Sequence, residues 1–214
     1  MSRIRRTAAT VLGVVLVVLG AAVGLGLLDG MDRAVDAALS PRHASDWYVE
    51  VRQLADALTT VLNPRLVVPV TLAAGLVLHR RGNRAALRTV LPPVLAMAGS
   101  VIALKVALRR AGPPGSPPVD LLGWWPSGHT ATSLVCLGAL AALSGRRWPR
   151  WATGIVTTAL AGSMLVIRAH WLSDLAGAAV LGALTLVVLL PSTDREPAGQ
   201  PAGLAGPLER HTRT

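Results

Sequence analysis

A histidine and an aspartate four residues apart form the most reactive pairing in this sequence. His170 and Asp174 stand in the run His-Trp-Leu-Ser-Asp. They share one helix face if the helix reaches back to His170, because residues i and i+4 are neighbours on a helix. A carboxylate that binds one ring nitrogen leaves the other nitrogen free to attack, and histidine is a covalent nucleophile when a third group orients it. The pair is therefore a candidate nucleophile with its orienting carboxylate.

A second group of residues could bind and protonate an anionic substrate. An apolar segment begins at Ser127, Gly128 and His129, and the free N–H groups at a helix start bind anions. Gly128 has no Cβ to keep an anion from the backbone. His129 could protonate a leaving alkoxide, and Lys105 ends a neighbouring apolar segment with a positive charge. An anion site with two imidazoles indicates phosphoryl transfer, in which charge stabilisation is the main contribution.

Each of these residues also has an ordinary structural interpretation. Ser127 is a typical N-cap, and the helix dipole favours Asp174 in a first turn. The remaining side chains have common roles at a membrane interface, as a snorkelling lysine, polar histidines or an aromatic belt: Lys105, His129, His170, Trp124 and Trp125. Each of these ordinary roles would have to be true separately. The predicted membrane topology instead places all the ionisable groups on one face. The common site is therefore favoured.

The composition indicates a membrane protein. Hydrophobic residues make up 52% of the 214 residues and charged residues 15%, against about 25% charged residues in a typical soluble domain. The formal net charge is +10, but the arginines stand in short clusters between apolar runs, which orients membrane helices rather than binding nucleic acid. Cys136 is the only cysteine, so no intrachain disulfide forms. We expect contact with a bilayer and no nucleic-acid partner.

Six apolar segments are expected to span the membrane as one all-α bundle. The first is too long for the apolar region of a signal peptide, so we expect an uncleaved helix. The bundle is expected to occupy residues 1–190, and the Pro/Gly/Ala-rich residues 191–214 a disordered cytoplasmic tail. The expected spans are residues 7–28, 66–78, 89–104, 127–144, 152–167 and 172–190.

A polar stretch at residues 29–65 separates the first two expected spans. Within it Trp47, Val51, Leu54, Leu58 and Val61 recur at helical spacing. This pattern predicts one amphipathic helix lying in the membrane interface. The Asn-Pro pair at residues 63–64 should end that helix, because proline disfavours helical backbone at the residue before it.

The positive-inside rule orients the bundle with both termini in the cytoplasm. That topology puts Lys105, the 127–129 turn and the segment from Arg168 to Asp174 on one outer face, where buried ionisable groups are candidates for function. Some arginines remain outside, among them Arg33, Arg42, Arg52 and Arg65. The larger number falls inside: Arg3, Arg5, Arg6, Arg80, Arg81, Arg84, Arg88, Arg146, Arg147, Arg150, Arg195, Arg210 and Arg213.

These motifs resemble the type 2 phosphatidic acid phosphatases, or lipid phosphate phosphatases, which share a catalytic core with acid phosphatases and vanadium haloperoxidases. The resemblance covers residues 64–190, with its signature at residues 105–174. Pro-Ser-Gly-His at 126–129 and His-x-x-x-Asp at 170–174 are intact. The resemblance implies that His170 forms a phosphohistidine, Asp174 orients it and His129 protonates the leaving group. It also implies that Lys105, Ser127 and Gly128 hold phosphate, without a metal or other cofactor.

Two departures from the family signature remove both of its phosphate-binding arginines. Gly112 stands before a proline where the family has Arg-Pro, and Met164 follows a serine where the family has Ser-Arg. Glycine and methionine cannot replace a bidentate arginine. We hypothesise that Arg168, with Arg110 second, supplies the missing charge from a shifted position.

The sequence thus predicts hydrolysis of a phosphomonoester or diphosphate on a lipid, at the outer face of a plasma membrane. Phosphatidic acid, phosphatidylglycerol phosphate and polyprenyl phosphates all fit, and the oligomeric state is left open. Richness in alanine, arginine and valine suggests a bacterial source. The alternative is a weakened or inactive phosphatase-like protein that binds lipid headgroups, which the missing arginines favour. The retained motifs disfavour a small transporter.

Overall fold

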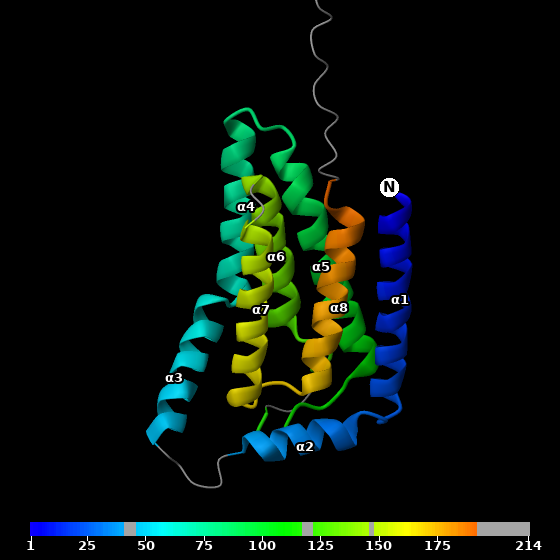
Figure 1. Cartoon of the computed structure of the whole chain (residues 1–214), viewed down its shortest axis with the longest axis vertical. Coiled ribbons are helices and arrows are strands. Elements are labelled where there is room, and N and C mark those ends of the chain that lie inside the picture. Colours follow the sequence, from blue (N-terminus) through cyan, green and yellow to red (C-terminus); the bar gives the residue numbers. More distant parts are fainter. Residues whose placement is uncertain (41–45, 117–121, 146–147, 192–214) are drawn as a thin grey trace, which may run out of the picture.

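Eight helices and no strand make up the described part of the chain in a computed structural model, which describes residues 1–40, 46–116, 122–145 and 148–191 (Figure 1). The prediction of an all-α fold is confirmed. The helices are α1 (Arg3–Gly24), α2 (Asp29–Leu39), α3 (Asp46–Val61), α4 (Pro64–Arg80), α5 (Ala86–Leu108), α6 (Gly128–Ser144), α7 (Trp148–Val166) and α8 (Leu172–Leu189). Each of the six predicted spans coincides with one helix, and the predicted tail lies outside the described residues except for Pro191.

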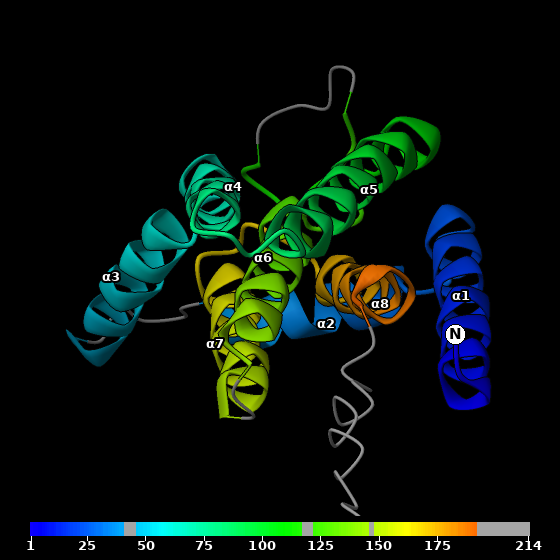
Figure 2. The same cartoon turned by 90° about the horizontal axis from the view of Figure 1, so that it is seen from above.

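Helix α6 is the centre of the bundle. It packs against α4, α5, α7 and α8, while α1 packs on the outside of α8 and α3 on α7 (Figure 2). Its fully buried Val135 and Cys136 meet core residues such as Met97 of α5 and Leu181 of α8. Cys136 is therefore an apolar packing residue, as its place in the sequence predicts. The start of α6 is consequently held by four neighbouring helices.

The outer surface of the bundle is apolar, as a lipid-facing surface requires. On α1, Val11, Val14, Val17 and Val18 are exposed. A contiguous apolar surface of this kind is uncommon on a soluble monomer. By length and composition α1, α5 and α8 could each cross a membrane. The pair Tyr48–Val61 and Pro64–Arg80, bent by 42°, could make a fourth span. The remaining apolar helices, Gly128–Ser144 and Trp151–Val166, are shorter, and six spans remain a prediction.

The stretch between the first two predicted spans contains two helices, where the sequence predicts one. The amphipathic pattern is α3, and Asn63 caps α4 after the break, as expected. The side chains that α3 buries are Ala55 and Thr59, whereas Leu54 and Val61 are exposed. Of the predicted stripe, Leu58 therefore packs against the core, and Val51, Leu54 and Val61 face outward. The second helix, α2, lies across one end of the bundle (Figure 1), and the sequence analysis missed it.

The two ends of the bundle differ in what they carry. Arg5 of α1 donates hydrogen bonds to the carbonyl oxygens of Val187 and Leu190 at the end of α8, so both helix termini lie at one end. At the other end lie α2, the end of α5 and the starts of α6 and α8 (Figure 1). The candidate site residues all belong to that second end.

Candidate active site

His170 and Asp174 form the pair that their spacing predicts. Nδ1 of His170 lies 3.2 Å from Oδ2 of Asp174, and both side chains are almost completely buried. Helix α8 starts at Leu172, and the same Oδ2 accepts the backbone N–H of Trp171 at 3.1 Å. Asp174 is thus both a helix-capping carboxylate and the partner of the imidazole. A bond at Nδ1 leaves Nε2 for chemistry.

The start of α6 lies beside this pair. The backbone N–H of Ser127 donates to the carbonyl oxygen of Asp174 at 3.1 Å, which ties the two helix starts together. The hydroxyl of Ser127 accepts the N–H of Thr130 at 3.4 Å, so its ordinary role as N-cap is present. His129, in the first turn of α6, interacts electrostatically with both His170 and Lys105. The structure therefore places the two predicted histidines and the lysine at the same end of the bundle.

Gly128 has open space beside its backbone. A Cβ built there would meet one atom within 4 Å, the Cγ1 of Val101 at 3.9 Å, which is an ordinary contact. The N–H groups of a helix's first turn have no partner within the helix. Together these features leave room for an anion at the N-terminus of α6.

Lys105 is held by the chain segment that returns to α6. Its ammonium donates to the carbonyl oxygens of Gly123 at 2.7 Å and Trp124 at 3.2 Å. A Cβ on Gly123 would come within 2.8 Å of backbone atoms of Arg109 and Arg110, so this close approach requires glycine. An ammonium has three donors, and two carbonyl bonds leave one for an anion. Lys105 is thus oriented by the backbone.

Arg110 contacts the nucleophile pair through Asp174. Its Nη1 donates to Oδ1 of Asp174 at 2.8 Å and to Oγ of Ser173 at 2.5 Å. Its Nη2 donates to Asp32 at 2.6 Å and to Asp29 at 3.3 Å. Burial lowers the pKa of Arg110, but hydrogen bonds and charges from Asp32 and Asp174 outweigh burial and raise the pKa above its usual value. The guanidinium is therefore a permanent charge within a carboxylate cluster.

Arg168 forms a separate ion pair. Its Nε and Nη2 donate to the two carboxylate oxygens of Asp36 at 2.7 and 2.5 Å, and this hydrogen bonding raises the pKa of Arg168. Its φ of +58° lies in the left-handed region, which is uncommon for a residue with a side chain. In this arrangement Arg168 fastens α2 to the connection between α7 and α8. Binding phosphate would require its side chain to leave Asp36.

The structure gives a physical reason for both missing signature arginines. A Cβ on Gly112 would lie 2.7 Å from the ring of Trp124 and 2.8 Å from Ser116, so a larger side chain would have to displace them. Met164 is buried in the hydrophobic core, where an unpaired charge is costly. Neither position could take an arginine without rearrangement.

Sequence reasoning missed several contributors to this end of the bundle. Asp32 and Ser173 complete the hydrogen bonding around Arg110. The only available signal was the spacing of the aspartates at 29, 32 and 36 on one face of α2. The assignment of Trp125 to an interfacial belt is wrong, because this side chain is fully buried and donates to the carbonyl oxygen of Ser173 at 3.1 Å. Trp124 instead meets the ring of His170 edge-on, with centroids 5.2 Å apart.

A cavity of about 340 Å³ lies on the α1–α2 side of Arg110. Its wall includes Asp29, Asp32, Gly112 and Trp171. Across the described ranges, no group of three or more His, Cys, Asp or Glu has a metal-binding arrangement. Arg110 is also part of this wall.

The fold is that of a helical membrane protein, and comparisons with known proteins identify its family. The sequence model of the PAP2 superfamily matches residues 85–197, which is more than half of the chain. The fold is similar to the crystal structure of the first transmembrane PAP2 type phosphatidylglycerolphosphate phosphatase from Bacillus subtilis. The TM-score is 0.71 at 18% sequence identity, over 85% of this chain and 93% of that chain. A search of curated proteins found no match.

The chain belongs to the PAP2 superfamily, and the resemblance inferred from its motifs is confirmed. It is a multi-pass membrane protein of this family. The matched region contains every candidate site residue.

Proposed function

We propose that this protein hydrolyses a phosphomonoester or diphosphate on a lipid, through a phosphohistidine at His170. The observation that carries the proposal is the contact of His170 Nδ1 with Asp174 at 3.2 Å, next to the start of α6 where His129 lies. A histidine oriented by a carboxylate is the arrangement that an activated nucleophile requires.

In the first step, Nε2 of His170 attacks phosphorus and the bond from phosphorus to the leaving oxygen breaks. His129 gives that oxygen a proton, which releases the lipid alcohol or monophosphate. Asp174 accepts the Nδ1 proton of His170 in a hydrogen bond and stabilises the positive charge on the phosphorylated ring. Phosphate leaves in the second step, when water attacks the phosphohistidine and His129 takes a proton from that water.

The phosphate oxygens are proposed to bind Lys105, the hydroxyl of Ser127 and the N–H groups that begin at Gly128. Support comes from the lysine oriented by the carbonyl oxygens of Gly123 and Trp124 and from the open space at Gly128. Such preorganised donors act most strongly on the charge that develops in the transition state.

Arg110 and Arg168 are the proposed replacements for the signature arginines. Arg110 is favoured by its contact with Asp174, the partner of His170. For Arg168 the motivating observation is its place two residues before His170. Because Arg168 is paired with Asp36, the proposal requires Arg168 to leave that carboxylate in order to bind phosphate.

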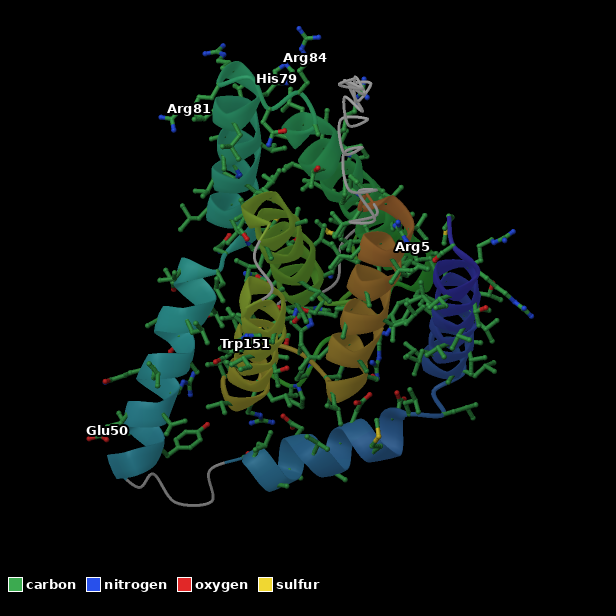
Figure 3. All side chains as sticks on the ribbon, turned by 45° about the horizontal axis from the view of Figure 1, so that its top comes forward. Arg5, Glu50, His79, Arg81, Arg84 and Trp151 are labelled. Carbon is green, nitrogen blue, oxygen red and sulfur yellow. The ribbon has the colours of Figure 1, made fainter. Side chains whose placement is uncertain are left out.

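The site is proposed to face the outside of a bacterial plasma membrane, in a bundle of six spans with both termini inside. The distribution of charge supports this orientation. Arg81 and Arg84 lie at the turn between α4 and α5, at one end of the bundle. Glu50 lies near the start of α3, toward the other end of the bundle (Figure 3). The end that carries Glu50 also carries the aspartates of α2 (Figure 1).

The test of the proposed function is phosphate release by the purified protein in detergent. Phosphatidic acid, phosphatidylglycerol phosphate and a polyprenyl diphosphate would be offered in the presence of EDTA. We expect release that survives chelation and disappears in His170→Ala. Release that requires an added divalent metal would overturn the metal-independent mechanism.

A second candidate function is a weakened phosphatase scaffold that binds lipid headgroups. The observation that favours it is that the described hydrogen bonds of the Arg110 and Arg168 guanidinium groups go to carboxylates and to Ser173. An inactive wild-type protein that still binds vesicles containing phosphatidic acid would support this alternative.

A further inference from the structure

We propose that Asp32 of α2 is a positioning residue for His170, acting through Arg110 and Ser173 on Asp174. Asp32 belongs to none of the sequence motifs and comes from a helix outside the region that the family model matches. The inference rests on the proposed function, because it assigns Asp32 a part in that reaction.

Both carboxylate oxygens of Asp32 are engaged although the residue is only 1% exposed. Oδ1 accepts the backbone N–H of Ser173 at 3.0 Å. Oδ2 accepts the hydroxyl of Ser173 at 2.5 Å and Nη2 of Arg110 at 2.6 Å. A buried carboxylate is costly unless it is paired and hydrogen-bonded. These bonds meet that condition and fix the carboxylate against the first turn of α8.

The hydrogen bonding continues from Asp32 to the imidazole. Arg110 uses Nη1 for Ser173 Oγ and for Oδ1 of Asp174, at 2.5 and 2.8 Å. The other oxygen of Asp174 faces His170 Nδ1 at 3.2 Å. Arg110 thereby holds one oxygen of Asp174, and the rotation of that carboxylate is restricted while it accepts from the ring.

Charge gives Asp32 a second effect on the same pair. Arg110 is only 10% exposed, so water screens its charge weakly. Without Asp32, Arg110 would have, among the described residues, only Asp174 at 2.8 Å and the more exposed Asp29 at 3.3 Å as counterions, and its charge would draw Asp174 away from the histidine. Asp32 shares Arg110 from the opposite side at 2.6 Å. Asp174 therefore retains negative charge for the Nδ1 proton of His170.

The test compares Asp32→Asn with a matched control. Asparagine keeps the shape of aspartate and removes its charge. We expect kcat to fall by up to about 100-fold, the cost of a small misplacement of reacting groups. Any change in KM should be smaller than the change in kcat, because Asp32 reaches the phosphate site only through Arg110. Asp56→Asn makes the same substitution at an exposed position on α3, and it should leave kcat and KM unchanged.

A spectroscopic signal separates positioning from general destabilisation. The Nδ1 proton of an imidazole bonded to a carboxylate gives a low-field NMR resonance, which His170→Ala assigns. We expect this resonance to shift or vanish in Asp32→Asn and to stay in place in Asp56→Asn. Wild-type kcat together with an unchanged resonance in Asp32→Asn would overturn the inference.

The experiments also distinguish failure of the inference from failure of the proposed function. If Asp32→Asn does not fold, Ser173→Ala takes its place, because it removes the hydroxyl that donates to Asp32 and accepts from Nη1 of Arg110, beside the direct bond from Nη2 to Asp32. It should lower kcat more than it changes KM and should shift the resonance, and wild-type values of kcat and of the resonance would contradict the inference. If the wild-type protein hydrolyses no lipid phosphate, the proposed function fails. The response of the resonance to Asp32→Asn then decides the inference alone.

Discussion

His170 and Asp174 face each other at the start of α8, with 3.2 Å between Nδ1 and Oδ2. Oδ1 of the same carboxylate is bound by Arg110, and the carbonyl oxygen of Asp174 accepts the N–H of Ser127. One residue thereby connects the candidate nucleophile, a buried guanidinium and the candidate phosphate site. The chemistry should be most sensitive at this residue.

Asp174→Asn should therefore abolish most of the activity while the fold persists. Asparagine has the same shape but only one oxygen, so it cannot accept hydrogen bonds from Arg110, Trp171 and His170 as the carboxylate does. It also favours the wrong tautomer of the His170 ring. A comparable change in a serine protease triad costs about 10⁴-fold in kcat. Initial rates of phosphate release would measure the loss, and thermal unfolding in detergent would check the fold. A rate within tenfold of wild type would contradict the assigned role of Asp174.

Gly128→Ala tests the anion site at α6. The added Cβ meets only Val101, at 3.9 Å, so the melting temperature should stay close to that of wild type. The Cβ nevertheless occupies the approach to the helix N-terminus, and we expect kcat/KM to fall about 10²-fold, as when one stabilising donor is lost.

Gly123→Ala provides the contrast for that experiment. Its Cβ would press on backbone atoms of Arg109 and Arg110 within 2.8 Å, at a cost of about 1–3 kcal/mol in unfolding free energy. The two variants should thus separate a loss of chemistry from a loss of stability. A fully active Gly128→Ala protein would remove this glycine from the phosphate site.

Arg168→Ala and Asp36→Asn together decide what Arg168 does. If Arg168 binds phosphate, Arg168→Ala should lower kcat/KM about as much as Lys105→Ala does, some 10²–10³-fold for a charge-stabilising group. Asp36→Asn would release the guanidinium and should leave kcat/KM equal or higher. If Arg168 only fastens α2, both variants should lose thermal stability alike. Full activity of Arg168→Ala would show that Arg168 does not replace a signature arginine.

Single cysteines at the two ends of the bundle test its orientation. We expect Glu50→Cys to react with a membrane-impermeant maleimide on intact cells and Arg84→Cys to react only after permeabilisation. The native Cys136 is buried in the core, so it should react little with the maleimide. Cys136→Ala removes this background labelling. The reverse labelling pattern would place the candidate site inside the cell.

The sequence predicts much of this fold because apolar runs and their breakers are local features. Asn63 and Pro64 end one helix and begin the next, as expected. Helix α2 was missed because its length and mixed polarity do not stand out from a polar loop, and its three aspartates gain meaning only beside Arg110 and Arg168.

The candidate site was predictable where the groups lie within one motif. The pairing of His170 with Asp174 follows from helical spacing, and the N-cap role of Ser127 follows from its position before an apolar run. The partners of Arg110 were not predictable, because they come from α2 and α8, distant in sequence. For Trp125 the aromatic-belt rule failed, since Gly20 and Gly177 leave room for its ring inside the bundle.

The most direct test of the central claim is to trap the phosphoenzyme. A lipid labelled with ³²P in its terminal phosphate would be mixed with protein in EDTA, quenched in alkali and separated by electrophoresis. We expect label on the wild-type protein that is stable to base and lost in acid, as a phosphohistidine is, and none on His170→Ala. Phosphate release by the wild-type protein without labelled protein, or label that persists in His170→Ala, would contradict the account.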